Sequence, residues 1–139
     1  MAIVVGVDSS PHAVSVLERA ILEAERRTEE LHVVHVFHPP VVYLEIPIDL
    51  VTVAEAERGA VWAPLNQSIS DAGSTVKKID LEGYPPDTLV DYAKDVDASL
   101  LVVGSRGRGE LASLILGSTS HRAIHLAPCD VLVVKPQSV

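Results

Sequence analysis

Five short segments with strand patterns alternate along this chain with segments that carry helix signals. Four of them are apolar runs rich in Val, Leu, Ile and Ala, at residues 2–8, 31–37, 99–103 and 131–134, and the fifth covers residues 75–81. Hydrophobic residues make up 47% of the sequence but aromatic residues only 4%, which is typical of buried parallel strands covered by helices. The order βαβαβαβαβ therefore predicts the α/β class: a single doubly wound, five-stranded parallel sheet, Rossmann-like, with helices on both faces.

Four helices are expected between these strands. Ser9-Ser10-Pro11 places a capping serine before a proline, which predicts a helix from there to about residue 28. A second helix is expected over residues 49–72, with Gly73 as its end. The other two are expected at 87–95, after a loop at 83–86, and at 117–126, before Pro128. Residues 41–48 are expected to form an irregular loop.

Chain length and the absence of signal-peptide, membrane-span and zinc patterns limit the class of protein that the sequence predicts. The 139 residues suit one compact domain, expected over 1–139. The apolar runs are too short to span a bilayer, and Met1-Ala2-Ile3-Val4-Val5-Gly6 contains no basic leader, so no signal peptide is expected. Cys129 has no disulfide partner, and no Cys/His cluster has zinc spacing. A cytoplasmic protein is the simplest expectation.

Charge is spread unevenly along the chain. The net charge is −8, which argues against general nucleic-acid binding. Residues 104–139 hold four cationic side chains against two acidic ones, a net +2, so the first 103 residues carry −10. An anion is therefore attracted to the last quarter of the chain and repelled elsewhere.

A glycine series lies in that cationic region. Gly104-Ser105-Arg106-Gly107-Arg108-Gly109 follows a predicted strand, and Gly117-Ser118-Thr119 opens a predicted helix. Glycines let backbone amides approach an oxyanion, and a helix N-terminus favours phosphate. Arg106 and Arg108 could pair with terminal phosphate oxygens. The spacing Gly-x2-Gly-x9-Gly-Ser is neither a P-loop nor a dinucleotide fingerprint. Local chemistry fits either a phosphate site or a surface loop followed by a capped helix.

Two further positions lie at the predicted carboxyl ends of strands, where α/β proteins bind ligands. Asp8 could accept hydrogen bonds from ribose hydroxyls or meet an adenine edge, but taken alone such a residue is more commonly a helix cap or a solvated loop acid. Val36 and Phe37 could offer backbone groups and an apolar wall to a purine, or they could simply pack in the core.

Taken together, these pieces resemble the universal stress protein family over nearly the full length. The matching pieces are Val5-Gly6-Val7-Asp8-Ser9-Ser10, Val34-His35-Val36, Gly83-x-Pro85, Leu101-Val102-Val103-Gly104-Ser105-Arg106-Gly107, Gly117-Ser118-Thr119 and Ala127-Pro128-Cys129-Asp130-Val131-Leu132-Val133-Val134. The Gly-x2-Gly-x9-Gly-Ser spacing is the signature of that family's ATP-binding branch, and every glycine of it is present here.

The resemblance implies a fold of the adenine nucleotide alpha hydrolase type and a set of residue roles. Asp8 holds the ribose and adenine side, Gly6 and Val7 line the floor, and Val36 meets adenine through its backbone. Phosphates lie between the two glycine segments. The full implied ATP site is Gly6, Val7, Asp8, Val36, Val103, Gly104, Ser105, Arg106, Gly107, Arg108, Gly109, Gly117, Ser118 and Thr119. Any Mg²⁺ arrives on the ATP phosphates. The resemblance also implies a homodimer that pairs the last strands, Val131, Leu132, Val133 and Val134.

The implied function is an ATP-binding regulatory or sensor protein of the stress response, acting as a homodimer with protein partners the sequence does not identify. Two alternatives stay open. One is a slow ATPase or phosphotransferase that uses Arg106, Ser118 and His121, although a P-loop lysine and an acidic pair beside the phosphate loop are missing. The other is an interaction module that binds AMP or cyclic AMP. His121 and His125 lie one helical turn apart, without the Glu of the metalloprotease arrangement.

Overall fold

The computed structural model of the protein describes residues 1–39, 49–105 and 116–136. Five parallel strands form one sheet in the order β3-β2-β1-β4-β5. The strands are β1 Ala2–Val7, β2 Glu30–Phe37, β3 Val76–Glu82, β4 Ala98–Gly104 and β5 Asp130–Val134. The predicted fold class, a doubly wound five-stranded parallel sheet, is confirmed.

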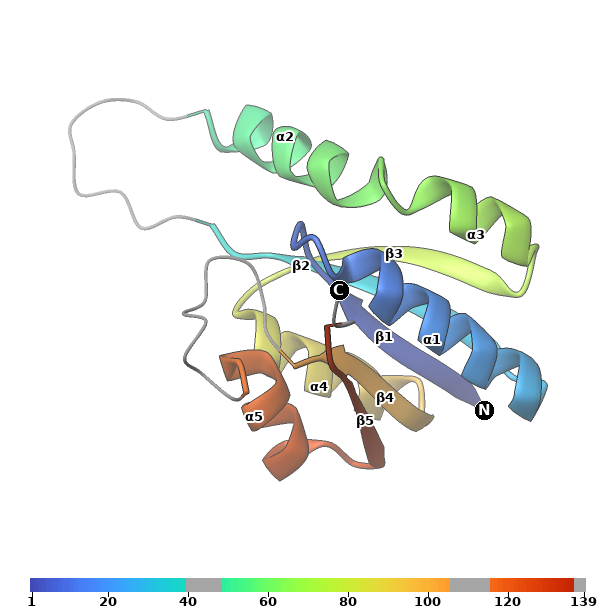
Figure 1. Ribbon diagram of the computed structural model, residues 1–139. Coiled ribbons are helices and arrows are strands. Elements are labelled where there is room, and N and C mark those ends of the chain that lie inside the picture. The colour runs from blue at the N-terminus through green and yellow to red at the C-terminus, as the bar shows by residue number, and fades with distance from the viewer. Residues whose placement is uncertain (40–48, 106–115, 137–139) are drawn as a thin grey trace.

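Helices cover both faces of this sheet (Figure 1). They are α1 Ala13–Arg27, α2 Leu50–Trp62, α3 Asn66–Ala72, α4 Pro85–Asp95 and α5 Ser118–Leu126. The first three lie over one face, and α4 and α5 lie over the other. Alternation along the strands separates two cores: Val5 on β1 packs toward α1, and its neighbour Val4 packs toward α4. No helix in the described ranges is both long enough and apolar enough to cross a membrane.

The strand order reverses between β1 and β4, which are neighbours in the sheet although the chain visits β2 and β3 in between. The β1–β2 ladder continues to the pair Val7 and His35, whereas the β1–β4 ladder ends at Val5 and Val102. The last residues of β1 and β4 are therefore not paired with each other. Such a switch point opens a crevice at the carboxyl ends of the strands, where ligands of α/β proteins bind.

Three helix boundaries differ from the prediction. The first helix begins at Ala13, and its N-cap His12 makes no side-chain capping bond. The predicted serine cap is wrong, because the amide of Ser10 donates to Asp8 Oδ1 at 2.8 Å and builds a turn there. The segment predicted as one helix over 49–72 is two helices. Pro64 lies at the break, since it has no N–H to donate to the preceding turn.

Helix α4, which was predicted to begin at Asp87, begins at Pro85. Both prolines of the predicted loop therefore lie in its first turn. Proline is favoured there because the first amides of a helix have no partner in the helix. Gly73 is the C-cap of α3, as predicted. The start of α4 matters for the site, because it brings Pro85 to the carboxyl edge of the sheet.

A substitution at Gly83 tests the turn between β3 and α4. Gly83 has a φ of +149°, and a Cβ at this position would meet the Thr88 hydroxyl. We expect Gly83→Ala to lower the free energy of unfolding by roughly 1–3 kcal/mol, measured by urea denaturation. Gly59 in α2 is the matched control, because a Cβ there meets nothing within 4 Å. Gly59→Ala should raise stability by up to about 1 kcal/mol, since alanine is the better helix former. Equal effects of the two substitutions would contradict this account of the turn.

Candidate functional site

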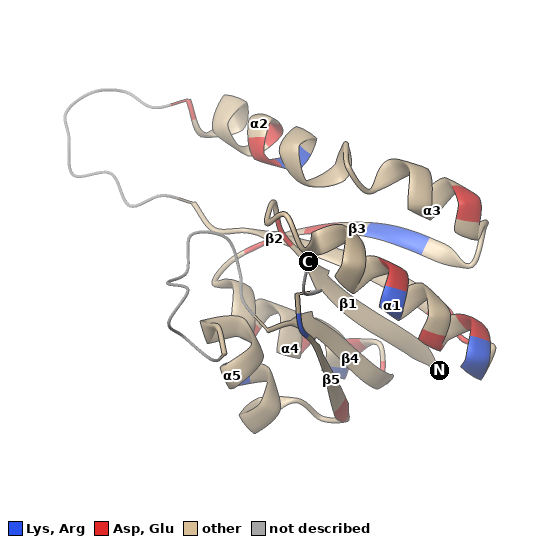
Figure 2. Ribbon diagram, in the orientation of Figure 1, with Lys and Arg blue, Asp and Glu red and all other residues tan. Residues whose placement is uncertain are grey.

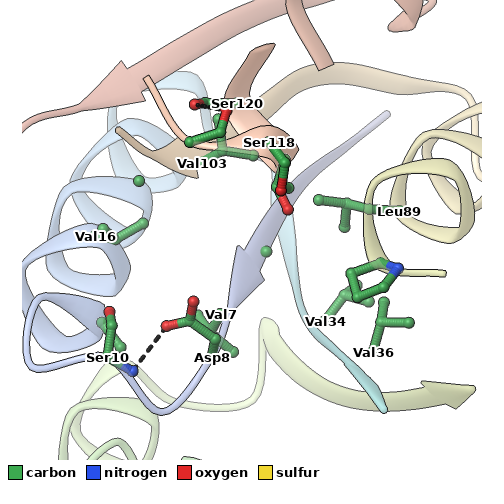
Figure 3. Close-up of a pocket in the computed structure, with 16 residues that line it drawn as sticks. Val7, Asp8, Ser10, Val16, Val34, Val36, Leu89, Val103, Ser118 and Ser120 are labelled. Atoms are coloured by element: carbon green, nitrogen blue, oxygen red, sulfur yellow. Dashed lines mark hydrogen bonds between the residues drawn. The ribbon is translucent and has the colours of Figure 1, made fainter. Parts of the chain in front are cut away.

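A pocket of about 240 Å³ lies at the carboxyl ends of β1, β2 and β4 (Figure 3). Three helices, α1, α4 and α5, and the turn before α1 complete its walls. The lining residues are Gly6, Val7, Asp8, Ser10, Ala13, Val16, Val34, Val36, Pro85, Leu89, Val103, Gly104, Gly117, Ser118, Thr119 and Ser120. The pocket therefore coincides with the switch point of the sheet.

Most of the sequence-predicted site residues meet in this pocket. Those that line it are Gly6, Val7, Asp8, Val36, Val103, Gly104, Gly117, Ser118 and Thr119. Ser105 is the described member of the predicted set that does not line it. Arg106, Gly107, Arg108 and Gly109 lie outside the described residues. Segments far apart in the sequence are thus brought together from β1, β2, β4 and α5.

One wall of the pocket is apolar. Val34 and Val36 point from β2 into the same region as Leu89 of α4 (Figure 3). Helix α4 approaches the sheet closely here. A Cβ built on Gly6 of β1 would lie only 2.6 Å from Cδ2 of Leu89. A flat apolar ring system fits against such a wall. Most small-molecule sites in proteins have a similarly apolar lining.

A carboxylate lies opposite, at the end of β1. Asp8 Oδ1 accepts the hydrogen bond from the Ser10 amide at 2.8 Å, which holds the loop after β1 in a turn (Figure 3). Among the described lining residues Asp8 is the one ionisable side chain. A carboxylate held this way can accept hydrogen bonds from ligand hydroxyls.

Ser105 and Gly117, the described residues nearest to the two glycine segments' junction, are hydrogen-bonded to each other. The Gly117 amide donates to the Ser105 carbonyl at 2.6 Å. The Ser120 hydroxyl lies 3.2 Å from the same carbonyl, and the Ser105 amide donates to the Val134 carbonyl at 2.9 Å. Ser105 is 3% exposed. Its backbone hydrogen bonds hold the end of β4 against β5 and α5. The chain thus leaves the sheet and returns to it beside the pocket.

The first turn of α5 forms the polar end of the pocket. Gly117 is its N-cap, and Ser118, Thr119 and Ser120 follow along the lining. Within the helix, the His121 amide is already bonded to the Gly117 carbonyl at 3.0 Å. A helix N-terminus carries a partial positive charge, and its first amides suit an anion. This end of the pocket therefore favours phosphate oxygens.

Acidic and basic residues of the described chain lie on α1, α2, α3 and β3, among other places (Figure 2). Neither β1 nor β4 contains a charged residue. Arg122 of α5 is 3.0 Å from Asp87 of α4, and this hydrogen bond raises the pKa of the guanidinium above its ordinary value. Since the predicted phosphate ligands Arg106 and Arg108 lie outside the described residues, the described polar end consists of a helix terminus and hydroxyl groups.

The histidines that invite catalytic roles do not line the pocket. His35 is 2% exposed and lies on the other face of β2 from Val36. Its Nδ1 and Nε2 are 3.1 Å from Asp80 Oδ1 and 2.9 Å from Glu57 Oε2. The ring also packs edge-on against Trp62. His35 therefore joins β2, β3 and α2 in the core.

Several lining residues escaped the sequence reasoning: Ser10, Ala13, Val16, Val34, Pro85, Leu89 and Ser120. Val34 could have been found, because it lies two residues before Val36 on the same face of a strand. Leu89 belongs to a helix that follows β3 in the chain, so only the tertiary fold brings it to β1.

The sequence and the fold both resemble those of known proteins. The model of the universal stress protein family matches residues 1–135. The chain belongs to this family. A Thermus aquaticus member, "Universal stress protein in QAH/OAS sulfhydrylase 3'region", is 32% identical over 139 residues and covers 96% of this chain and 97% of its own.

Solved structures of the family have the same fold. The universal stress protein UspA from Lactobacillus plantarum is 27% identical, with a TM-score of 0.85 over 96% of this chain and 97% of that one. A universal stress protein solved in complex with cAMP is also 27% identical, with a TM-score of 0.71 over 99% and 98% of the two chains. The latter protein is thus a relative that binds an adenine nucleotide.

Proposed function

We propose that this universal stress protein binds an adenine nucleotide, ATP by the glycine spacing, in the pocket between β1 and β4. The observation that carries the proposal is the convergence of Gly6–Asp8, Val36, Gly104 and Gly117–Thr119 on one pocket. The glycine motif alone left a surface loop as an equal alternative. Its two ends meet at a switch point, beside an apolar wall and a carboxylate, which is a combination that a nucleotide needs.

The chemistry of the lining suggests an orientation for the nucleotide. The adenine ring packs against Val34, Val36 and Leu89, and the ribose hydroxyls donate to Asp8. The phosphates extend toward the N-terminus of α5, where Gly117 and Ser118 lie. Mg²⁺ is bound through the phosphates, as it usually is in nucleotide sites. The relative solved with cAMP supports the class of ligand.

The nucleotide itself is tested directly. Purified protein is denatured, and the released small molecules are identified by mass spectrometry. We expect ATP; AMP or cyclic AMP would keep the site and change the ligand. Protein isolated without a nucleotide is titrated with ATP, AMP and cyclic AMP by calorimetry. If none of the three binds at millimolar concentration, the proposed function is wrong.

The proposed biological role is regulation rather than catalysis. A nucleotide changes the state of a protein only if it binds two states with different affinity. A slow ATPase is separated from this role by incubating the ATP complex with Mg²⁺ for days and measuring released phosphate. We expect the ATP to remain intact.

The homodimer is part of the same proposal. In the sheet order, β5 is the edge strand next to β4, and Val131, Leu132, Val133 and Val134 are each only partly covered. An edge strand this apolar calls for a partner. Sedimentation should therefore give twice the chain mass of 14.9 kDa. A monomer at tens of micromolar would overturn the dimer and leave the nucleotide site untouched.

A further inference from the structure

Two histidines lie together on the outer face of α5. His121 and His125 are both exposed, and their ring centroids are 4.8 Å apart with the planes at 64°. Positions four apart on a helix share one face, so the backbone itself brings the two imidazoles together. Neither histidine lines the nucleotide pocket.

We propose that His121 and His125 form a binding site for a divalent transition-metal ion of the Ni²⁺, Cu²⁺ or Zn²⁺ type. Neutral imidazole is a preferred ligand of these ions, and a carboxylate-free pair selects against Mg²⁺ and Ca²⁺. Within the described residues, no group of three or more His, Cys, Asp or Glu side chains is placed to hold a metal. Among the described side chains the two histidines are therefore the ligands, and water molecules occupy further coordination positions.

The helix dipole favours a cation beside His125. His125 lies in the last turn of α5, where the partial negative charge of a helix C-terminus attracts cations. The nearest cationic side chain along the helix, Arg122, is engaged with Asp87 of α4 at 3.0 Å. The guanidinium is therefore held toward α4, which reduces its repulsion of an ion at the imidazoles.

The ion also affects the helix that carries it. Both ligands lie within a helix of nine residues, and bridging successive turns holds them in helical geometry. Because the first turn of the same helix lines the pocket, an ion at His121 and His125 stabilises one wall of the pocket from outside.

Cys129 is the alternative ligand to exclude. Burial raises the pKa of its thiol above the ordinary value, and the Asp130 carboxylate adds to the shift. A protonated thiol is a poor metal ligand. We therefore expect Cys129 to contribute little at neutral pH.

The test is calorimetric titration of tag-free, full-length protein with NiCl₂ in a buffer that does not chelate metals. We expect one ion per chain and a rise in Tm with Ni²⁺. His121→Ala and His125→Ala should each weaken binding roughly tenfold or more and abolish the rise in Tm. Because both side chains are exposed, circular dichroism should show intact folding. His121→Gln serves as a second variant if the alanine variant unfolds.

Two substitutions serve as controls, and each should leave Ni²⁺ binding unchanged. His38→Ala removes another exposed histidine, and Cys129→Ser removes the thiol. No binding of Ni²⁺ at millimolar concentration, or binding that survives both α5 substitutions, would overturn the proposal. The titration uses protein from which bound nucleotide has been removed, so its result is independent of the proposed function.

Discussion

Gly117→Val is expected to weaken ATP binding roughly 100-fold, which corresponds to about 3 kcal/mol. Gly117 is buried, lines the pocket and precedes the first turn of α5, the end where the phosphates are placed. Its φ of −75° and ψ of 171° are open to any residue. The expected loss therefore comes from the volume of the new side chain in the space of the phosphates. Calorimetric titration with ATP measures it.

The matched control for Gly117→Val is Gly59→Ala, on an exposed part of α2. This substitution should leave the affinity for ATP unchanged. Gly117→Ala adds less volume and should give an intermediate loss. A Gly117→Val protein that folds, as judged by its Tm, and binds ATP like the wild type would show that the phosphates lie elsewhere.

Asp8→Ala is expected to lower ATP affinity roughly tenfold to 100-fold, because charge-assisted hydrogen bonds to the ribose are lost. The same change should remove discrimination between ATP and 2′,3′-dideoxy-ATP, which lacks the hydroxyls that donate to the carboxylate. Titration of wild type and variant with both nucleotides measures this difference.

Asp8 also holds the Ser10 amide, so the loss of the turn must be separated from the loss of the ribose contact. Asp8→Asn keeps an oxygen for that amide and removes the charge, and it should fall between wild type and Asp8→Ala. Asp71→Ala removes an exposed acid of α3. It should change neither the affinity for ATP nor the discrimination against 2′,3′-dideoxy-ATP. If Asp8→Ala retained full discrimination against the dideoxynucleotide, the assignment of Asp8 to the ribose would be wrong.

The sheet could be predicted from the sequence because its signal is local. Each buried strand of a parallel sheet must be apolar on both faces, so Val4 and Val5, or Leu101 and Val102, are apolar as neighbours. The alternation of strands and helices also predicted a ligand site at the carboxyl ends of the strands. The carboxyl-end positions Asp8, Val36 and Gly104 then followed without any knowledge of tertiary contacts.

Helix boundaries were less predictable, because they depend on which hydrogen bond wins a local competition. Ser10 was assigned as a helix cap, but its amide is bonded to the Asp8 carboxylate and the helix begins later, at Ala13. Pro64 divides the second helical segment and could have been recognised from its missing N–H.

The distant walls of the site could not be predicted. Leu89 and Pro85 belong to α4, and their place beside β1 depends on the path of the chain over the opposite face of the sheet. Ser105 was expected as a ligand because the family resemblance implied it. Its backbone bonds to Gly117 and Val134 assign it a structural part that only the folded chain reveals.

The most direct test of the nucleotide site is a titration of ¹⁵N-labelled protein with ATP, followed by NMR of the backbone amides. We expect the largest shifts at Gly6, Asp8, Gly104 and Gly117, around the pocket between β1 and β4. A second hollow, of about 430 Å³, lies at the amino ends of β2 and β3 and includes Glu25 and Glu30. If the shifts were confined to residues around this second hollow, with no change at the amides around the first pocket, ATP would not bind between β1 and β4.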